Sequence, residues 1–81
     1  MRKYIATFGV YENSSIMGEV EREIEAENKR QAKIIAMDVA REIEEEYAKN
    51  SKQAYMENGY AEDEVPSFDY WASLEELDYV K

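Results

Sequence analysis

The chain has 81 residues, enough for one hydrophobic core and too few for a second, so we predict a single domain over residues 1–81. Its apolar content of 44% is ordinary for a globular protein, and its net charge of −9 disfavours direct contact with DNA, RNA or an anionic membrane, whose phosphates repel it. The absence of cysteine and histidine excludes disulfides, thiol or imidazole catalysis and the usual zinc sites, and a cytoplasmic location is the simplest interpretation.

The negative charge is concentrated in the second half of the chain. Residues 1–41 hold seven acids and seven bases, whereas residues 42–81 hold twelve acids and three bases. No apolar run approaches the roughly 20 residues that span a bilayer, and the first ten residues lack the apolar core of a signal peptide. We therefore expect no membrane partner. The acidity favours a basic protein partner, or serves solubility alone.

The first predicted element is a strand over residues 3–11. Its residues alternate, and both faces carry apolar groups, which favours a central position in a sheet. One face has Tyr4, Ala6, Phe8 and Val10, and the other has Ile5, Thr7, Gly9 and Tyr11.

A second strand is predicted over residues 19–27, after a polar loop over residues 12–18 ("ENSSIMG"). The alternation of "EVEREIEAE" places five glutamates on one face, an alignment that only a strand provides. The opposite face has Val20, Ile24 and Ala26 together with Arg22, which we interpret as an amphipathic side chain at the sheet edge with its head in water. The two strands predict a hairpin.

A long amphipathic helix is predicted from Asn28 onward. Asn28 is a good N-cap, and Gln31 lies at the capping-box spacing. Its end stays open between Asn50-Ser51 and the "ENG" of residues 57–59, a natural C-cap. The apolar stripe consists of Ala32, Ile35, Ala36, Val39, Ala40, Ile43 and Tyr47.

After the helix, "NGYAEDEVP" predicts an acidic, turn-rich loop, and a third strand is predicted over residues 67–73. "SLEE" at residues 73–76 fits a capping box, so a terminal helical turn from Leu74 and a continued strand stay open as alternatives. Tyr4, Phe8, Tyr47 and one of Tyr70 or Trp71 are expected in the core.

These elements predict an α+β fold, a small ββαβ domain. A right-handed crossover from the second strand to the third gives a three-stranded antiparallel sheet of order 2-1-3, with the one long helix packed on one face. The other face is then uncovered and carries Ile5, Thr7 and Tyr11 beside the glutamate row.

Two acidic stretches suggest a binding surface. Alternate residues of a strand lie roughly 6–7 Å apart, close to the estimated spacing of phosphates along a nucleic-acid strand, so the glutamate row is a candidate phosphate mimic. Protection of an edge strand from pairing is the alternative interpretation, and the two are compatible. In "EIEEE" (residues 42–46), like charges crowd at three- and four-residue spacing, which costs a few tenths of a kcal/mol per contact. If the helix stopped at Asn50, its negative C-terminal end would also disfavour them.

The candidate partner-binding residues come from these stretches and from the acidic segment with aromatic residues near the C-terminus. They are Glu19, Glu21, Glu23, Glu25, Glu42, Glu44, Glu45, Glu46, Tyr60, Glu62, Asp63, Glu64 and Asp69.

We expect no catalysis, no cofactor and no metal. The sequence has no nucleophile motif and no phosphate-binding glycine loop. The tight cluster "EDE" at residues 62–64 is typical of a solvated loop.

In small size, in acidity confined largely to one half and in the absence of catalytic groups, the whole chain resembles phage-encoded anti-defence proteins, anti-CRISPR proteins in particular. The stretches that carry this resemblance of type are "EVEREIEAE", "EIEEE" and "YAEDEVPSFDYW". It implies binding to a Cas effector or similar nuclease in the host cytoplasm and blockage of nucleic-acid entry. The alternative is an interaction module or antitoxin whose acidity serves solubility and whose open sheet face forms a homodimer.

Overall fold

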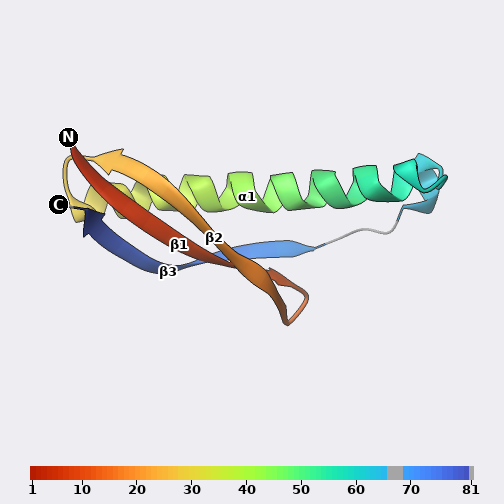
Figure 1. The fold of residues 1–81 in the computed structure, drawn as a ribbon, viewed down its shortest axis with the longest axis horizontal. Helices are drawn as coiled ribbons and strands as arrows, with labels where there is room; N and C mark the ends of the chain where they lie inside the picture. Colours follow the sequence, from red (N-terminus) through yellow and green to blue (C-terminus); the bar gives the residue numbers. More distant parts are fainter. Residues whose placement is uncertain (66–68, 81) are drawn as a thin grey trace.

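The computed structural model describes residues 1–65 and 69–80, which form a three-stranded antiparallel sheet and one long helix (Figure 1). The sheet order is β2-β1-β3, and the helix packs on one face of it, as the sequence predicted. The elements in chain order are β1 (Arg2–Glu12), β2 (Ser15–Ala26), α1 (Lys29–Glu57), the 3-10 turn η1 (Glu62–Glu64) and β3 (Tyr70–Val80).

The hairpin between β1 and β2 is tighter than the sequence suggested. The polar loop predicted over residues 12–18 is wrong in its extent, because β2 already begins at Ser15 and only residues 13 and 14 form the turn. Asn13 adopts a φ of 56°, a left-handed conformation that asparagine tolerates better than most residues. The pairing register shifts between Val10 and Tyr11, so the extra residue is absorbed as a bulge inside the strands.

The helix begins where its capping residues predicted. The Asn28 side-chain oxygen accepts a hydrogen bond from the Gln31 backbone N–H at 2.9 Å. The Gln31 side chain reaches back and accepts from the Glu27 backbone N–H at 2.6 Å, one residue earlier than in a standard capping box. Glu27 therefore lies beyond the end of β2 and belongs to the start of the helix rather than to the glutamate row.

The helix ends at Glu57, so the longer of the two predicted alternatives is correct. Asn58 closes it, with its side-chain amide donating to the Ala54 carbonyl oxygen at 2.9 Å. Gly59 follows with a φ of 94°, a conformation that favours glycine at a helix end. The glutamates of residues 42–46 thus lie in the middle of α1, away from the negative end of the helix dipole.

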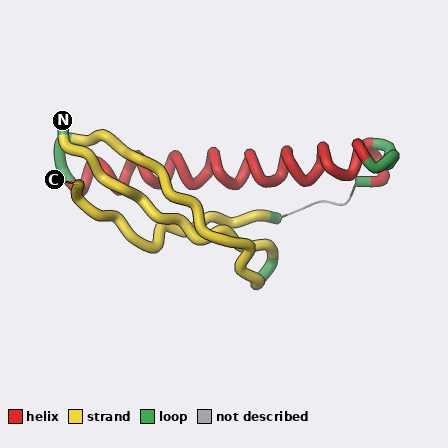
Figure 2. Tube along the Cα trace, in the orientation of Figure 1, coloured by secondary structure: helices red, strands yellow, loops and turns green. Residues whose placement is uncertain are grey.

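The hydrophobic core lies between α1 and one face of the sheet (Figure 2). Phe8, at the centre of β1, is fully buried together with Ile43 of the helix. Ala32 and Ala36 are also fully buried, and their small side chains let the helix approach the sheet closely. Of the two expected aromatic candidates near the C-terminus, Tyr70 packs against the core, with its ring 5.7 Å from that of Tyr47.

The C-terminal segment is a continuous strand, so the alternative helical turn from Leu74 does not form. β3 pairs with β1 from Tyr70 opposite Glu12 to Val80 opposite Lys3, which satisfies the backbone groups along that side of β1. A register shift between Thr7 and Phe8 marks a bulge in this pairing. Residues 66–68, which include the predicted beginning of this strand, lie outside the described residues.

The C-terminal turns of α1 extend past the sheet (Figure 1). The hydroxyl groups of Ser51 and Tyr70 are hydrogen-bonded to each other near the start of β3. Beyond this contact, the Tyr55 and Tyr60 rings meet edge to face at 5.2 Å, and Lys52 Nζ lies 2.7 Å from Glu62 Oε1. The acidic segment after the helix is thus folded back onto the helix end.

Replacing Phe8 by alanine is expected to remove most of the stability of the domain. Large-to-small changes of buried aromatic residues cost about 3–5 kcal/mol, and a domain of this length has a free energy of unfolding of about 4–12 kcal/mol. Urea unfolding followed by circular dichroism measures the loss. Thr7→Ala, one residue away on the opposite sheet face, is the control and should cost less than about 1 kcal/mol. Equal losses for the two variants would contradict the one-sided core.

Candidate functional site

The candidate site is the sheet face that α1 does not cover, which we call the open face (Figure 1). On β2, the four glutamates of the predicted row are all exposed on this face. The register places Glu19 opposite Gly9, Glu21 opposite Thr7 and Glu23 opposite Ile5. Among the described residues, the open face consists of Lys3, Ile5, Thr7, Gly9 and Tyr11 of β1, Ile16, Glu19, Glu21, Glu23 and Glu25 of β2, and Trp71, Ser73, Glu75, Glu76, Asp78 and Val80 of β3.

A second row of carboxylates on β3 was not predicted. Glu76 lies opposite Thr7 and Asp78 lies opposite Ile5, and both side chains are exposed. Glu75, displaced by the bulge, also reaches this face, because its carboxylate contacts the Tyr11 hydroxyl. The sequence reasoning missed this row because it left residues 74–80 open between strand and helix. The alternation of Glu76, Leu77 and Asp78 was the signal for it.

The open face is strongly negative. Among the described residues, four carboxylates on β2 and three on β3 share this face with one cationic side chain, that of Lys3, whose Nζ lies 3.5 Å from Glu23 Oε1. Because β1 lies between the two edge strands, the rows are roughly 10 Å apart, twice the spacing of neighbouring strands. Within the β2 row, successive carboxylates repeat every 6–7 Å or so. The arrangement is two parallel lines of negative charge with a less polar strip between them.

One end of this strip is aromatic. The rings of Tyr11 and Trp71 lie 5.3 Å apart, and the Tyr11 hydroxyl donates a hydrogen bond to Glu75 Oε1 at 2.9 Å. Gly9 lies beneath this pair. A Cβ atom at Gly9 would approach Glu75 Oε1 to 2.8 Å and the Tyr11 ring to 3.1 Å, so a larger residue here would displace the Glu75 carboxylate from its present position. The Trp71 side chain remains 58% exposed, beside the two acidic rows.

The carboxylate of Glu75 also changes the acidity of Tyr11. Its hydrogen bond to the hydroxyl raises the pKa of Tyr11 above the ordinary value, with smaller contributions from desolvation and from the negative charges of Glu75 and Glu19. The phenol is therefore held in its neutral, hydrogen-donating form over a wider range of pH.

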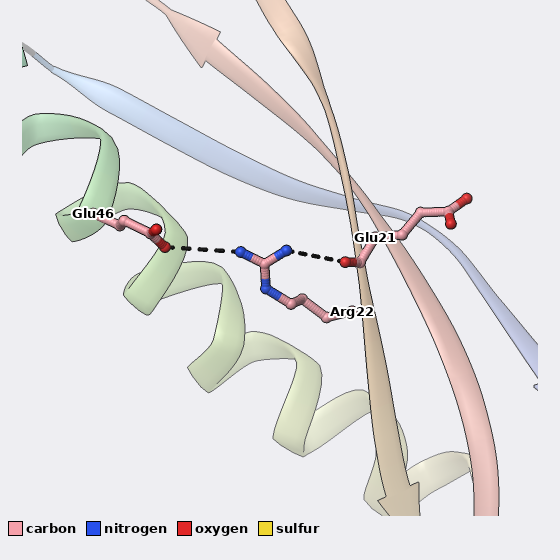
Figure 3. A network of polar contacts seen from close by, with 3 residues as sticks. All are labelled: Glu21, Arg22 and Glu46. Atoms are coloured by element: carbon pink, nitrogen blue, oxygen red, sulfur yellow. Dashed lines mark hydrogen bonds and ion pairs between the residues drawn. The ribbon is translucent and has the colours of Figure 1, made fainter. Parts of the chain in front are cut away.

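Two of the helix glutamates contact the sheet edges rather than solvent alone. Arg22 Nη2 lies 3.7 Å from Glu46 Oε2, and Arg22 Nη1 donates to the Glu21 carbonyl oxygen at 3.0 Å (Figure 3). The Arg22 side chain is exposed, as predicted, but it joins α1 to β2 as well. On the other side, Glu44 Oε1 accepts a hydrogen bond from the Ala72 backbone N–H of β3 at 3.4 Å.

Glu42 and Glu45 are exposed on α1, away from the open face. Tyr60, Glu62 and Glu64 lie beyond the end of the helix. The hydrogen bond from Lys52, together with its positive charge, lowers the pKa of Glu62, and Glu64 Oε1 accepts a hydrogen bond from the Ala61 backbone N–H at 3.1 Å. Asp63 and Asp69 are exposed in the same connection. The predicted residues therefore form three groups, on the open face, on the helix and at the helix end, and Asp69 lies apart from them, directly before β3.

Residues 1–65 and 69–80 contain no group of three or more acidic side chains placed to hold a metal ion. Within the same residues, α1 has the length to cross a membrane but not the apolar character. Comparison with protein-family models, with curated proteins and with solved structures finds no match for this chain.

The raised pKa of Tyr11 gives a pH dependence that can be tested. Because the fold favours the neutral phenol, the contribution of this contact to stability is present below the unfolded pKa of about 10 and is lost as the pH rises through the higher folded pKa. Titration of tyrosinate absorbance in the wild type and in Tyr11→Phe isolates this one residue by difference. In Glu75→Gln, the Tyr11 pKa should fall toward the ordinary value. An unchanged titration would contradict the contact.

Proposed function

We propose that the protein is a non-enzymatic inhibitor that binds a basic nucleic-acid-binding protein, such as a Cas effector or another nuclease, and occupies its nucleic-acid site. The observation that carries the proposal is the pair of parallel carboxylate rows on the open face, with seven acids against one lysine among residues 1–65 and 69–80. The choice of target class follows the resemblance of the whole chain to anti-defence proteins.

The spacing of the rows supports nucleic-acid mimicry. Each β2 carboxylate follows the previous one at about the distance that separates successive phosphates, and the rows are roughly 10 Å apart, between the widths of the minor and major grooves of B-DNA. A nucleic-acid-binding groove of the partner, lined with lysine and arginine, would therefore meet carboxylates at intervals similar to those of the phosphates that it normally binds. Complementary fields of this kind speed association and depend steeply on salt.

The aromatic end of the strip supports a protein partner rather than mere solubility. Acids that only guard the edge strands do not require the large apolar surface of Trp71 to remain exposed beside them. Trp and Tyr are enriched among the residues that dominate binding energy at protein interfaces. Trp71 and Tyr11 also offer ring faces on which an arginine of the partner can stack.

The alternative, a homodimer formed through the open face, is less favourable. Two copies meeting face to face would bring all of their β2 and β3 carboxylates together and leave each Lys3 already engaged with Glu23. Juxtaposed like charges oppose association strongly. We therefore assign this face to a basic partner.

Neutralising the centre of the β2 row is expected to weaken inhibition. The test uses a panel of purified Cas effectors and nucleases with fluorescently labelled nucleic acid, and measures displacement of the labelled strand. The wild type should compete with the nucleic acid for at least one member, less effectively as salt rises. The triple variant Glu21→Gln, Glu23→Gln, Glu25→Gln should bind that member at least tenfold more weakly, mainly through a slower association rate.

The matched control removes charge outside the open face. Asp38→Asn with Glu42→Gln and Glu45→Gln takes three exposed carboxylates from α1 and should leave the affinity within about twofold, because these side chains lie off the binding surface. Equal weakening by the control and by the β2 variant would mean that net charge, rather than the carboxylate rows, governs binding.

A further inference from the structure

A groove runs along the free edge of β3, between that strand and α1. Two adjoining hollows form it, and both are lined by Met37 of the helix and by Leu74 of the strand. The hollow nearer the start of β3 also involves Arg41, Glu44 and Ala72, and the other involves Lys33. The groove borders the open face along β3, because Trp71, Ser73, Glu75 and Glu76 line it as well.

The β3 edge is the less protected of the two sheet edges. Among the described strands, β3 pairs with β1 alone, so no other strand lies along its outer side. The Ala72 N–H points to this side and is satisfied by Glu44 at 3.4 Å, a long hydrogen bond. The segment Tyr70–Leu74 has no charged side chain, whereas β2 carries a glutamate at every second position from Glu19 to Glu25. Charges of that kind protect an edge from adding another strand, and this part of β3 lacks them.

One side of the helix presents a stripe of charged and apolar side chains to the same groove. Its members are Lys33, Met37, Arg41 and Glu44, which the spacing of four, four and three residues places on one side of α1. The Met37 side chain is 64% exposed and lines both hollows, so it is available for contact with an occupant of the groove. The stripe is cationic toward the N-terminal end of the helix and anionic at Glu44.

This polarity makes the stripe complementary to itself. When two such helices lie antiparallel about a two-fold axis, the positions that meet are those equally far from the axis. An axis between Met37 and Arg41 is also midway between Lys33 and Glu44, which are eleven positions apart in the chain. It therefore brings each Lys33 next to the Glu44 of the other copy and packs Met37 in the centre. The same axis passes beside Ala72 and Leu74, because these residues line the groove with Met37 and Arg41.

We propose that the occupant of the groove is a second copy of this chain, which forms a two-fold dimer through β3 and α1. The two β3 strands pair antiparallel over Tyr70–Leu74, and the backbone of the second strand replaces Glu44 as partner of the Ala72 N–H. Glu44 is then released to pair with Lys33 of the second copy. The dimer has a six-stranded sheet whose only edges are the two glutamate-bearing β2 strands, and both open faces lie on the same side.

Charge reversal across the interface tests the proposal. Sedimentation velocity of the full chain should show a dimer for the wild type, and self-association should weaken at least tenfold in Lys33→Glu and in Glu44→Lys, because each variant opposes like charges twice. An equimolar mixture of the two variants should dimerise again, because each contact then joins a lysine to a glutamate. Native mass spectrometry, with one variant labelled with nitrogen-15, should detect the mixed dimer. Its formation also shows that both variants are folded.

Two further variants complete the design. Met37→Glu places a charge at the centre of the interface and should abolish dimerisation, while its circular dichroism spectrum stays that of the wild type, because Met37 is exposed in the single chain. Glu42→Lys makes the same charge change as Glu44→Lys on another side of α1 and should leave the dimer intact. A wild type with a dissociation constant weaker than about 1 mM, or a mixture that yields no mixed dimer, would overturn the proposal.

Discussion

The structure depends on the burial of one face of β1 under a single helix. Phe8 and its neighbours at every second position of β1 are buried. Alanines and Ile43 of the helix belong to the same hydrophobic core. In the part of the chain that the structure describes, no second α-helix covers the other side, so that face is exposed to water. Its acidic edges follow from this constraint, because the hairpin cannot alternate apolar and polar groups without presenting one complete polar row. The candidate site is thus the necessary reverse side of the core.

The crowded glutamates of α1 show how a locally unfavourable sequence fits the fold. Repulsion at three- and four-residue spacing is real, but α1 runs to Glu57, and the acids are therefore far from the negative end of the helix dipole. Two of these glutamates contact opposite edges of the sheet. Glu46 contacts Arg22 on β2, whereas Glu44 contacts the Ala72 amide on β3. The helix is tied to both edges of the sheet by side chains that looked redundant in the sequence.

Periodicity was enough to predict the element order, the sheet order and the β2 row, because each rests on a strong local pattern. The hairpin turn and the bulges were not predictable, since tertiary pairing decides where an extra residue is absorbed. The carboxylate row on β3 was not predicted, because "SLEE" fits the start of a helix as well as a strand. Only the pairing of this segment with β1 decides between the two. The separation of the acidic stretches into three groups was not predicted, because it depends on the length of the helix. The sequence contains two possible stop signals for that helix.

The extension of α1 beyond the sheet gives the molecule an unusual hydrodynamic character. The chain measures 48 × 23 × 17 Å and has a radius of gyration of 15.2 Å, against about 12 Å for a compact domain of this length. A rod-like particle experiences more friction than a sphere of the same mass, so the monomer diffuses slowly and elutes early from a sizing column. It also tumbles anisotropically, and the amide bond vectors of α1, aligned with the long axis, sense a slower rotation than those of the strands, which cross the axis obliquely (Figure 1).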